Sequence, residues 1–195
     1  MASKTWLITG ASSGLGAAIA EAALQAGHRV IATARNPKKA AEDNPEISKL
    51  GGTWIELDVT DPNAAKKVSE TINQAGGGVI DVVVNNAGYS LLGSIEDMSE
   101  EEIQTQFSTN VFGPVRVLKG ALPFMRARKS GTIVNISSSA GLDGLPTCAM
   151  YAGSKFALEG ESGTKHACPE LMHFACLALK NDMLSEGFRY VRKSF

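Results

Sequence analysis

The sequence predicts an α/β fold in which helices cover both faces of a doubly wound parallel sheet. Strand-type and helical runs alternate along residues 5–162, and such alternation gives parallel strands joined by helical crossovers. The run VIDVVV at residues 79–84 is almost wholly apolar, as expected for a strand buried on both faces of a parallel sheet. A ligand site is therefore expected in the loops at the carboxyl ends of the strands.

Five strands are expected, and each is a short run rich in apolar or β-branched residues. They cover residues 5–9, 29–34, 53–57, 79–84 and 132–136. A glycine interrupts the chain after the first strand, and polar residues follow the others. The loops to examine therefore begin at Gly10, Arg35, Asp58, Asn85 and Ser137.

Helices are expected between these strands, at residues that typically start or stop a helix. A helical pattern runs from Gly14 towards Gly27. A long helical stretch extends towards Arg128, and a further helix begins near Tyr151. Cap residues followed by proline, or a capping box, mark the other helix starts: Asn36-Pro37, Asp61-Pro62 and Ser99 with Glu102.

Composition narrows the class of protein. The chain has 195 residues, room for one ordinary domain, and is 44% hydrophobic and 20% charged. Its net charge of -1 gives no basic excess to bind phosphate backbones, so no nucleic-acid partner is expected. No apolar run approaches the ~20 residues of a membrane span. Three cysteines and no secretory signal favour reduced thiols and a cytoplasmic protein, and no metal site is predicted.

The loop between the first strand and the first helix reads TGASSGLG at residues 9–16. Glycines let a backbone turn sharply and approach a pyrophosphate, and a helix N-terminus offers unpaired N–H groups. An ordinary glycine turn would have the same composition. If the loop binds phosphate, the residues that hold it are Gly10, Ser12, Ser13, Gly14, Leu15 and Gly16.

The ends of the next three strands offer residues for the rest of a dinucleotide. An acidic residue after the second strand would bind a ribose 2′-hydroxyl, but Arg35 stands there and favours the 2′-phosphate of NADP(H). A solvated surface arginine is the alternative. Asp58, followed by Val59, could accept a hydrogen bond from an adenine amino group or merely form a turn. After the fourth strand, small residues and an amide could pack on a ring or ribose or pin a turn: Asn86, Ala87 and Gly88.

A tyrosine and a lysine follow the fifth strand at a spacing that places them on one face of a helix. Tyr151 and Lys155 are four residues apart, so about one helical turn separates them. Ser138 lies just beyond the fifth strand, and Asn110 lies within the long helical stretch. Alone, the Tyr-x-x-x-Lys pattern also fits a surface tyrosine beside a solvated lysine.

In this order and at these strand ends, the features together resemble the motifs of the short-chain dehydrogenase/reductase family, whose core is Rossmann-like. The resemblance covers residues 5–162. It implies an NADP(H)-dependent oxidoreductase that interconverts a carbonyl and a secondary or primary alcohol by hydride transfer. Tyr151 is then the general acid or base. Lys155 would stabilise its phenolate and bind the nicotinamide ribose, while Ser138 would orient the carbonyl.

Asn110 is of separate interest because Pro114 lies four residues later. Proline has no N–H, so in a continuous helix the backbone carbonyl of Asn110 loses its usual partner. This carbonyl is hypothesised to bind a water that links to Lys155 and relays protons. A plain proline kink in a packed helix is the alternative.

The expected substrate is a small apolar carbonyl or alcohol, and the resemblance also implies that the chain can form a homo-oligomer. Loop residues that could line an apolar pocket, or contact no ligand, are Tyr89, Leu91, Leu142, Leu145, Cys148 and Met150. The other function considered is that of a catalytically inactive, cofactor-binding family member that acts through protein contacts.

The resemblance ends after Gly160. Residues 1–162 are expected to form the dinucleotide-binding and catalytic domain, and residues 163–195 an atypical, truncated C-terminal segment. Within that segment, residues 169–185 are expected to form a helix. The last strands of the family fold would then be absent, and the fifth strand would be an edge with unpaired backbone groups. This departure favours the inactive alternative.

Overall fold

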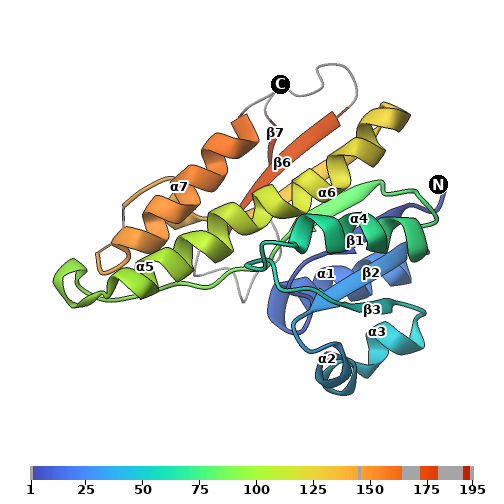
Figure 1. Cartoon of the computed structure of the whole chain (residues 1–195), viewed down its shortest axis with the longest axis horizontal. Coiled ribbons are helices and arrows are strands. Elements are labelled where there is room, and N and C mark those ends of the chain that lie inside the picture. The colour runs from blue at the N-terminus through green and yellow to red at the C-terminus, as the bar shows by residue number, and fades with distance from the viewer. Residues whose placement is uncertain (1, 145, 164–171, 180–190, 194–195) are drawn as a thin grey trace.

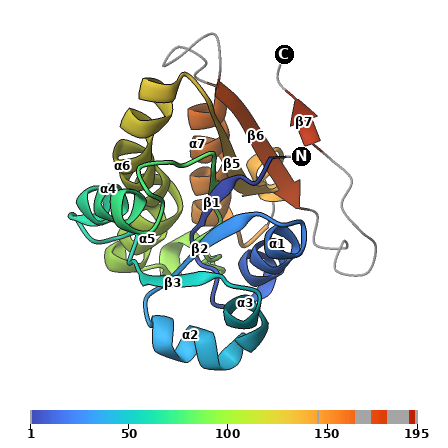
Figure 2. The same cartoon turned by 90° about the vertical axis from the view of Figure 1, so that its right-hand side faces the viewer.

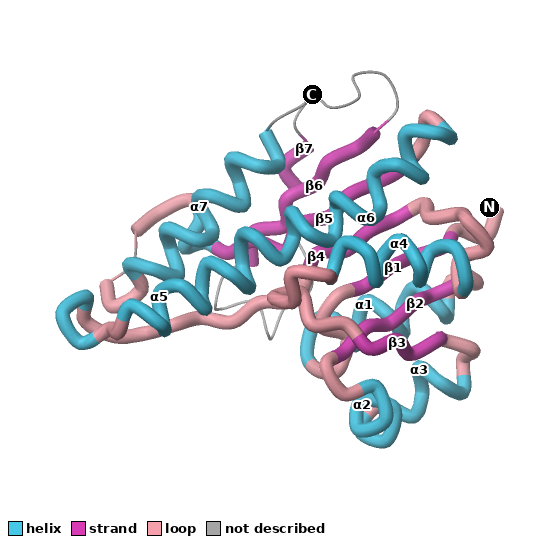
Figure 3. The backbone as a smooth tube through the Cα atoms, viewed as in Figure 1, coloured by secondary structure: helices cyan, strands magenta, loops and turns pink. Residues whose placement is uncertain are grey.

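The computed structural model describes residues 2–144, 146–163, 172–179 and 191–193, and in them helices cover both faces of one sheet (Figure 1). The strands run through the middle of the molecule with helices on either side (Figure 3). The doubly wound α/β fold that the sequence predicts is confirmed.

The strands lie in the order β3-β2-β1-β4-β5-β6-β7. The first five are β1 (Thr5–Ile8), β2 (Arg29–Ala34), β3 (Thr53–Glu56), β4 (Val82–Asn85) and β5 (Gly131–Ser138). All neighbours among them pair in parallel. Strands β2 and β3 follow one another on one side of β1, and β4 and β5 lie on its other side. Sheets of this kind bind ligands where the strand order reverses, so the loops after β1 and β4 are the place to look.

Helices on opposite faces bury the two sides of the strands, and Figure 2 shows α1 on one face with α4 and α6 on the other. Leu7 of β1 packs against the α4 and α6 side, whereas the next residue, Ile8, packs against the α1 side. Both side chains are fully buried, as expected for central strands. The helices are α1 (Gly14–Gln25), α2 (Pro37–Asp43), α3 (Pro45–Lys49), α4 (Ala64–Gln74), α5 (Glu100–Phe107), α6 (Gly113–Arg128) and α7 (Ala149–Gly163).

The two sequences in which a cap residue is followed by proline, Asn36-Pro37 and Asp61-Pro62, behave differently in the structure. The side chain of Asn36 accepts the N–H of Lys39 at 3.1 Å, so Asn36 caps α2 as predicted. Asp61 instead accepts the N–H of Asn63 at 2.8 Å and forms a turn. Helix α4 therefore begins at Ala64, later than the sequence predicts.

The long helical stretch is continuous but contains one wider turn. The predicted capping box starts α5, because the Ser99 hydroxyl accepts the Glu102 N–H and the Glu102 carboxylate accepts the Ser99 N–H. A π-helix, Ser108–Phe112, follows α5, and α6 continues from it. Pro114 lies in the first turn of α6 and cannot donate to the carbonyl of Asn110. A π turn accommodates such a break because its hydrogen bonds span five residues rather than four.

The helix expected over residues 169–185 is contradicted where the structure describes this range, at residues 172–179. Strand β6 (Met172–Leu179) occupies residues expected to be helical, and it pairs in parallel with β5 along its whole length. Strand β7 (Val191–Lys193) pairs antiparallel with β6. The apolar run of β6 suits a buried strand as well as a helix, and the open edge of β5 decides in favour of the strand.

Strand β5 is therefore not an edge, contrary to the expectation. Residues 164–171 and 180–190, where the expected helix would begin and end, lie outside the described residues. The division of the chain after residue 162 stays a prediction.

Candidate active site

Two glycines of the loop after β1 allow it to approach the end of β4. Gly10 has a φ of +65°, and a Cβ there would lie 2.9 Å from the Cα of Ala87. A Cβ on Gly16 would lie 2.4 Å from the carbonyl oxygen of Gly10 and 2.4 Å from Nδ2 of Asn86. No side chain fits at either position, so these two glycines have a steric reason to be glycine.

Hydrogen bonds hold the loops after β1 and β4 together. Nδ2 of Asn86 donates to the carbonyls of Thr9 and Gly10, at 2.9 and 3.0 Å. The Thr9 hydroxyl accepts the N–H groups of Asn86 and Ala87, each at 3.0 Å. The sequence analysis assigned no role to Thr9, because a threonine at a strand end carries no distinguishing signal.

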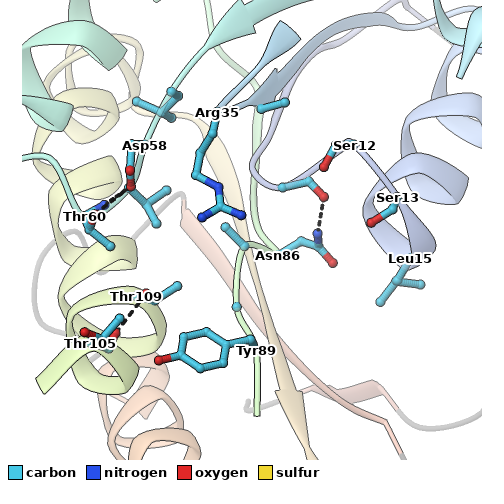
Figure 4. Close-up of a pocket in the computed structure, with 16 residues that line it drawn as sticks. Ser12, Ser13, Leu15, Arg35, Asp58, Thr60, Asn86, Tyr89, Thr105 and Thr109 are labelled. Atoms are coloured by element: carbon cyan, nitrogen blue, oxygen red, sulfur yellow. Dashed lines mark hydrogen bonds between the residues drawn. The ribbon is translucent and has the colours of Figure 1, made fainter. Parts of the chain in front are cut away.

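These loops line a cavity of about 660 Å³ at the carboxyl ends of the strands (Figure 4). Most of the residues predicted to bind a cofactor line it: Gly10, Ser12, Ser13, Leu15, Arg35, Asp58, Val59, Asn86, Ala87 and Gly88. Four of the predicted cofactor-binding residues are not among the lining residues: Gly14, Gly16, Tyr151 and Lys155. The two glycines lie in the first turn of α1, and Tyr151 and Lys155 lie on α7. Thr60, Tyr89, Thr105 and Thr109 also line the cavity, and the sequence analysis gave the three threonines no role.

The donors around this cavity fit a phosphate-bearing ligand. The first N–H groups of α1 have no partner within the helix, and the Ser13 side chain makes no capping hydrogen bond. Arg35 is exposed, and within the described part of the chain its guanidinium has no hydrogen-bond or ion-pair partner. Figure 4 shows this side chain extending into the cavity. A free fork of N–H donors beside a helix N-terminus suits a phosphorylated dinucleotide.

Asp58 forms a turn, one of the two roles that the sequence left open. Its Oδ1 accepts the N–H of Thr60 at 2.8 Å and the Thr60 hydroxyl at 2.7 Å. The residue still lines the cavity, so the turn fixes the position of this carboxylate at the cavity wall.

Three of the four predicted catalytic residues come from β5 and α7. Ser138 ends β5, is buried, and its hydroxyl accepts the N–H of Ala140 at 3.2 Å. Lys155 is only 6% exposed, and its Nζ donates to the carbonyl of Ile136 at 2.7 Å. The same Nζ lies 5.8 Å from the ring centroid of Tyr151. The structure therefore brings the lysine ammonium close to the tyrosine, and it ties that lysine to the strand that ends in Ser138.

Asn110 lies in the π-helix and is buried, and its side chain links two parts of the site. Its Nδ2 donates to the carbonyl of Tyr89 at 2.9 Å and to the Ser154 hydroxyl at 3.1 Å. The Ser154 hydroxyl in turn donates to the carbonyl of Tyr151 at 2.7 Å. The sequence analysis considered only the backbone carbonyl of Asn110, and the proposed water at that carbonyl stays a hypothesis.

The Tyr89 phenol lines the cavity, and its surroundings shift its ionisation. Partial burial, together with the negative charge of Glu102, raises the pKa of the Tyr89 phenol. The phenol therefore stays neutral, and it offers the cavity a hydroxyl and an aromatic face.

The other residues considered for an apolar pocket do not gather in this cavity. Met150 lines a separate cavity of about 610 Å³ beside α5 and the π-helix. Leu142 is 53% exposed, Cys148 is half-buried, and Leu145 lies outside the described residues. No helix in the described ranges is long and apolar enough to cross a membrane.

The chain belongs to the short-chain dehydrogenase family, because the family model of that description matches residues 4–168. An oxidoreductase of Passalora fulva, claN, is 53% identical over 161 residues, which are 82% of this chain and 72% of that protein. A solved short-chain dehydrogenase from Streptomyces avermitilis has a TM-score of 0.82 at 40% identity and aligns with 92% of this chain and 65% of its own. A metagenomic short-chain oxidoreductase solved in complex with NADP has a TM-score of 0.80 at 31% identity, covering 90% of this chain and 81% of its own.

The chain is shorter than most of these relatives. It spans 54% of the length of one further curated oxidoreductase and 58% of another, or little more than half. What the longer proteins do as a whole therefore comes to this chain only as a proposal.

Proposed function

We propose that this chain is an oxidoreductase that uses NADP(H) to interconvert a small apolar carbonyl compound and its alcohol by hydride transfer. The observation that carries the cofactor preference is the end of β2, where Ala34 is followed by Arg35 and both line the cavity. No carboxylate stands there to bind a ribose 2′-hydroxyl or repel a 2′-phosphate. The similar metagenomic oxidoreductase solved with NADP supports the same preference.

The residues around the cavity would each hold one part of the cofactor. The N-terminus of α1 with Ser12 and Ser13 would bind the pyrophosphate, and Arg35 the 2′-phosphate. Asp58 and Val59 would contact the adenine, and residues 86–88 the adjoining ribose. When bound, NADPH supplies the hydride that reaches the carbonyl carbon.

Tyr151 would move the proton that balances this hydride. In reduction its hydroxyl gives a proton to the carbonyl oxygen, and in oxidation the phenolate takes the proton of the alcohol. The buried Lys155 ammonium, whose Nζ lies 5.8 Å from the centre of the tyrosine ring, would stabilise the negative charge that develops on the Tyr151 oxygen during proton transfer. The Ser138 hydroxyl would hydrogen-bond the substrate oxygen and orient it.

Binding of both nicotinamide cofactors tests the cofactor proposal. Arg35→Asp should weaken NADPH binding by roughly tenfold to a hundredfold and leave NADH binding little changed, because a charge-assisted hydrogen bond is worth about 1.5–3 kcal/mol. Lys38→Asp is the matched control, since Lys38 is exposed on α2 and is not among the residues that line the cavity. Equal losses for NADPH and NADH in Arg35→Asp would contradict the preference.

Turnover tests the chemistry separately. The wild-type chain should consume NADPH with at least one member of a panel of apolar ketones and aldehydes. Tyr151→Phe should bind NADPH normally but lose turnover, because it keeps the ring and lacks the proton. Cofactor binding without turnover in the wild type would instead favour the inactive, protein-contacting function.

A further inference from the structure

Gln106 is a fully buried amide that the proposed mechanism does not use. It lies on α5 with 0% of its surface exposed. Its Oε1 accepts the N–H of Leu91 at 2.6 Å, and its Nε2 donates to the carbonyl of Tyr89 at 2.8 Å. Both ends of the amide are therefore bound to the backbone of the loop after β4. A buried amide is costly without such partners, so the orientation of this side chain is fixed.

Asn110 holds the same loop from one helical turn further on. Its Oδ1 accepts the N–H of Tyr89 at 3.2 Å, and its Nδ2 donates to the carbonyl of Tyr89 at 2.9 Å. Residues four apart share a helix face, so the two amides converge on the Tyr89 carbonyl from one side. We call the side chains of Gln106 and Asn110 the amide clamp.

The segment that the amide clamp holds is a wall of the cofactor cavity. Gly88 and Tyr89 both line the cavity, and Figure 4 shows the Tyr89 side chain among the labelled residues that line it. A Cβ on Gly88 would lie 3.0 Å from Oδ1 of Asn110, so the wall rests directly on the clamp. A change in the clamp must therefore shift the wall or leave a void behind it.

The amide clamp also reaches the catalytic helix. Asn110 donates to Ser154 on α7, and Ser154 donates to the carbonyl of Tyr151. One chain of hydrogen bonds, buried or partly buried, thus connects the cavity wall to the helix that carries Tyr151 and Lys155. Such a chain fixes distances more firmly than apolar packing, because each bond has a preferred length and direction.

We propose that Gln106 is a positioning residue for cofactor binding, acting through the backbone of Tyr89 and Leu91. This inference rests on the proposed function, since the wall matters only if the cavity holds NADP(H). Gln106 does not touch the reacting atoms. Its effect is expected in the affinity for cofactor, with a much smaller effect on the rate of the chemical step.

The test compares Gln106→Met, Gln106→Glu and the control Gln104→Met. Methionine has a similar length but cannot make either hydrogen bond, so Gln106→Met should raise the Kd and KM for NADPH roughly tenfold. Its kcat should change much less. Gln104 lies on the same helix but is exposed, and among the described residues its side chain hydrogen-bonds only to Glu100, so Gln104→Met should match the wild type.

Gln106→Glu supplies a rescue that a purely structural role would not show. A protonated carboxyl can accept the Leu91 N–H and donate to the Tyr89 carbonyl, as the amide does. The affinity of Gln106→Glu for NADPH should therefore approach that of the wild type as the pH falls. The wild type and Gln104→Met, measured at the same pH values, correct for other titrating groups. This comparison also serves if Gln106→Met does not fold.

The outcomes separate the two proposals. If the wild type binds NADPH and the folded Gln106→Met binds it equally well, the positioning role is wrong and the proposed function stands. Loss of thermal stability with an unchanged Kd leads to the same conclusion. If the wild type itself does not bind NADPH, the proposed function fails, and this inference fails with it.

Discussion

Replacing Gly16 by alanine should disrupt the contact between the loops after β1 and β4. The added Cβ would lie 2.4 Å from the carbonyl oxygen of Gly10 and from Nδ2 of Asn86, so at least one group must move. Asn86 then loses its hydrogen bonds to the Thr9 and Gly10 carbonyls, at a cost of about 2 kcal/mol. Residual crowding adds about 1–3 kcal/mol. The better helix propensity of alanine returns about 1 kcal/mol.

The expected result is a fall of about 2–4 kcal/mol in the free energy of unfolding, from these terms combined. Urea unfolding followed by tryptophan fluorescence measures it, since the chain has two tryptophans, Trp6 and Trp54. NADPH binding should weaken as well, because Gly10 and Asn86 line the cavity.

Gly14→Ala provides the matched comparison. A Cβ at Gly14 meets nothing within 4 Å, but the backbone φ of +56° is unfavourable for alanine. Its cost should be about 1–2 kcal/mol, from backbone strain alone. If Gly16→Ala is no less stable than Gly14→Ala and binds NADPH normally, the steric argument is refuted.

Three further substitutions have expected effects on stability. Ser99→Ala removes the capping box of α5 and should lower the free energy of unfolding by about 1 kcal/mol in urea melts, whereas the exposed Ser130→Ala should not. Burial raises the pKa of Glu161 to about 7, so the folded chain keeps a proton that the unfolded chain releases near pH 4.5. The stabilisation that this protonated group contributes is complete below pH 4.5 and is lost as the pH rises through about 7. In urea melts, the free energy of unfolding of Glu161→Gln should therefore fall less between pH 5 and pH 8 than that of the wild type. Equal falls in the two proteins would contradict the assignment. Thr147 has a φ of +64°, so Thr147→Gly should keep or slightly raise the melting temperature, and a clear loss would argue against strain there.

Local chemistry explains why much of the fold could be predicted from the sequence. The bounds of β2 match the prediction residue for residue, and Asn36 and Ser99 cap their helices as expected. These sequence patterns determine the structure of only the few residues around them, so they can be interpreted without knowledge of the tertiary structure. The apolar run at residues 172–179 carries no such signal, and only pairing with β5 shows that it forms a strand.

The candidate site also contains some residues that could be predicted from the sequence and others that could not. Glycine and arginine at strand ends can be recognised from the sequence as candidate binding residues, and Gly10, Gly88 and Arg35 do line one cavity in the structure. Gln106 and Ser154 could not be found from the sequence, because a glutamine or serine in a helix usually faces solvent. Their partners are backbone groups of Tyr89, Leu91 and Tyr151, which become neighbours only after folding.

The π turn sets the rotational phase between the two halves of the long helix. Each residue added to or removed from a helix turns everything beyond it by about 100°. Deleting one residue from Ser108–Phe112 would therefore leave α6 seated on α4 but swing Gln106 away from the loop it holds. The additional residue of the π turn lets α6 pack against α4 while Gln106 and Asn110 both contact the backbone of the loop after β4.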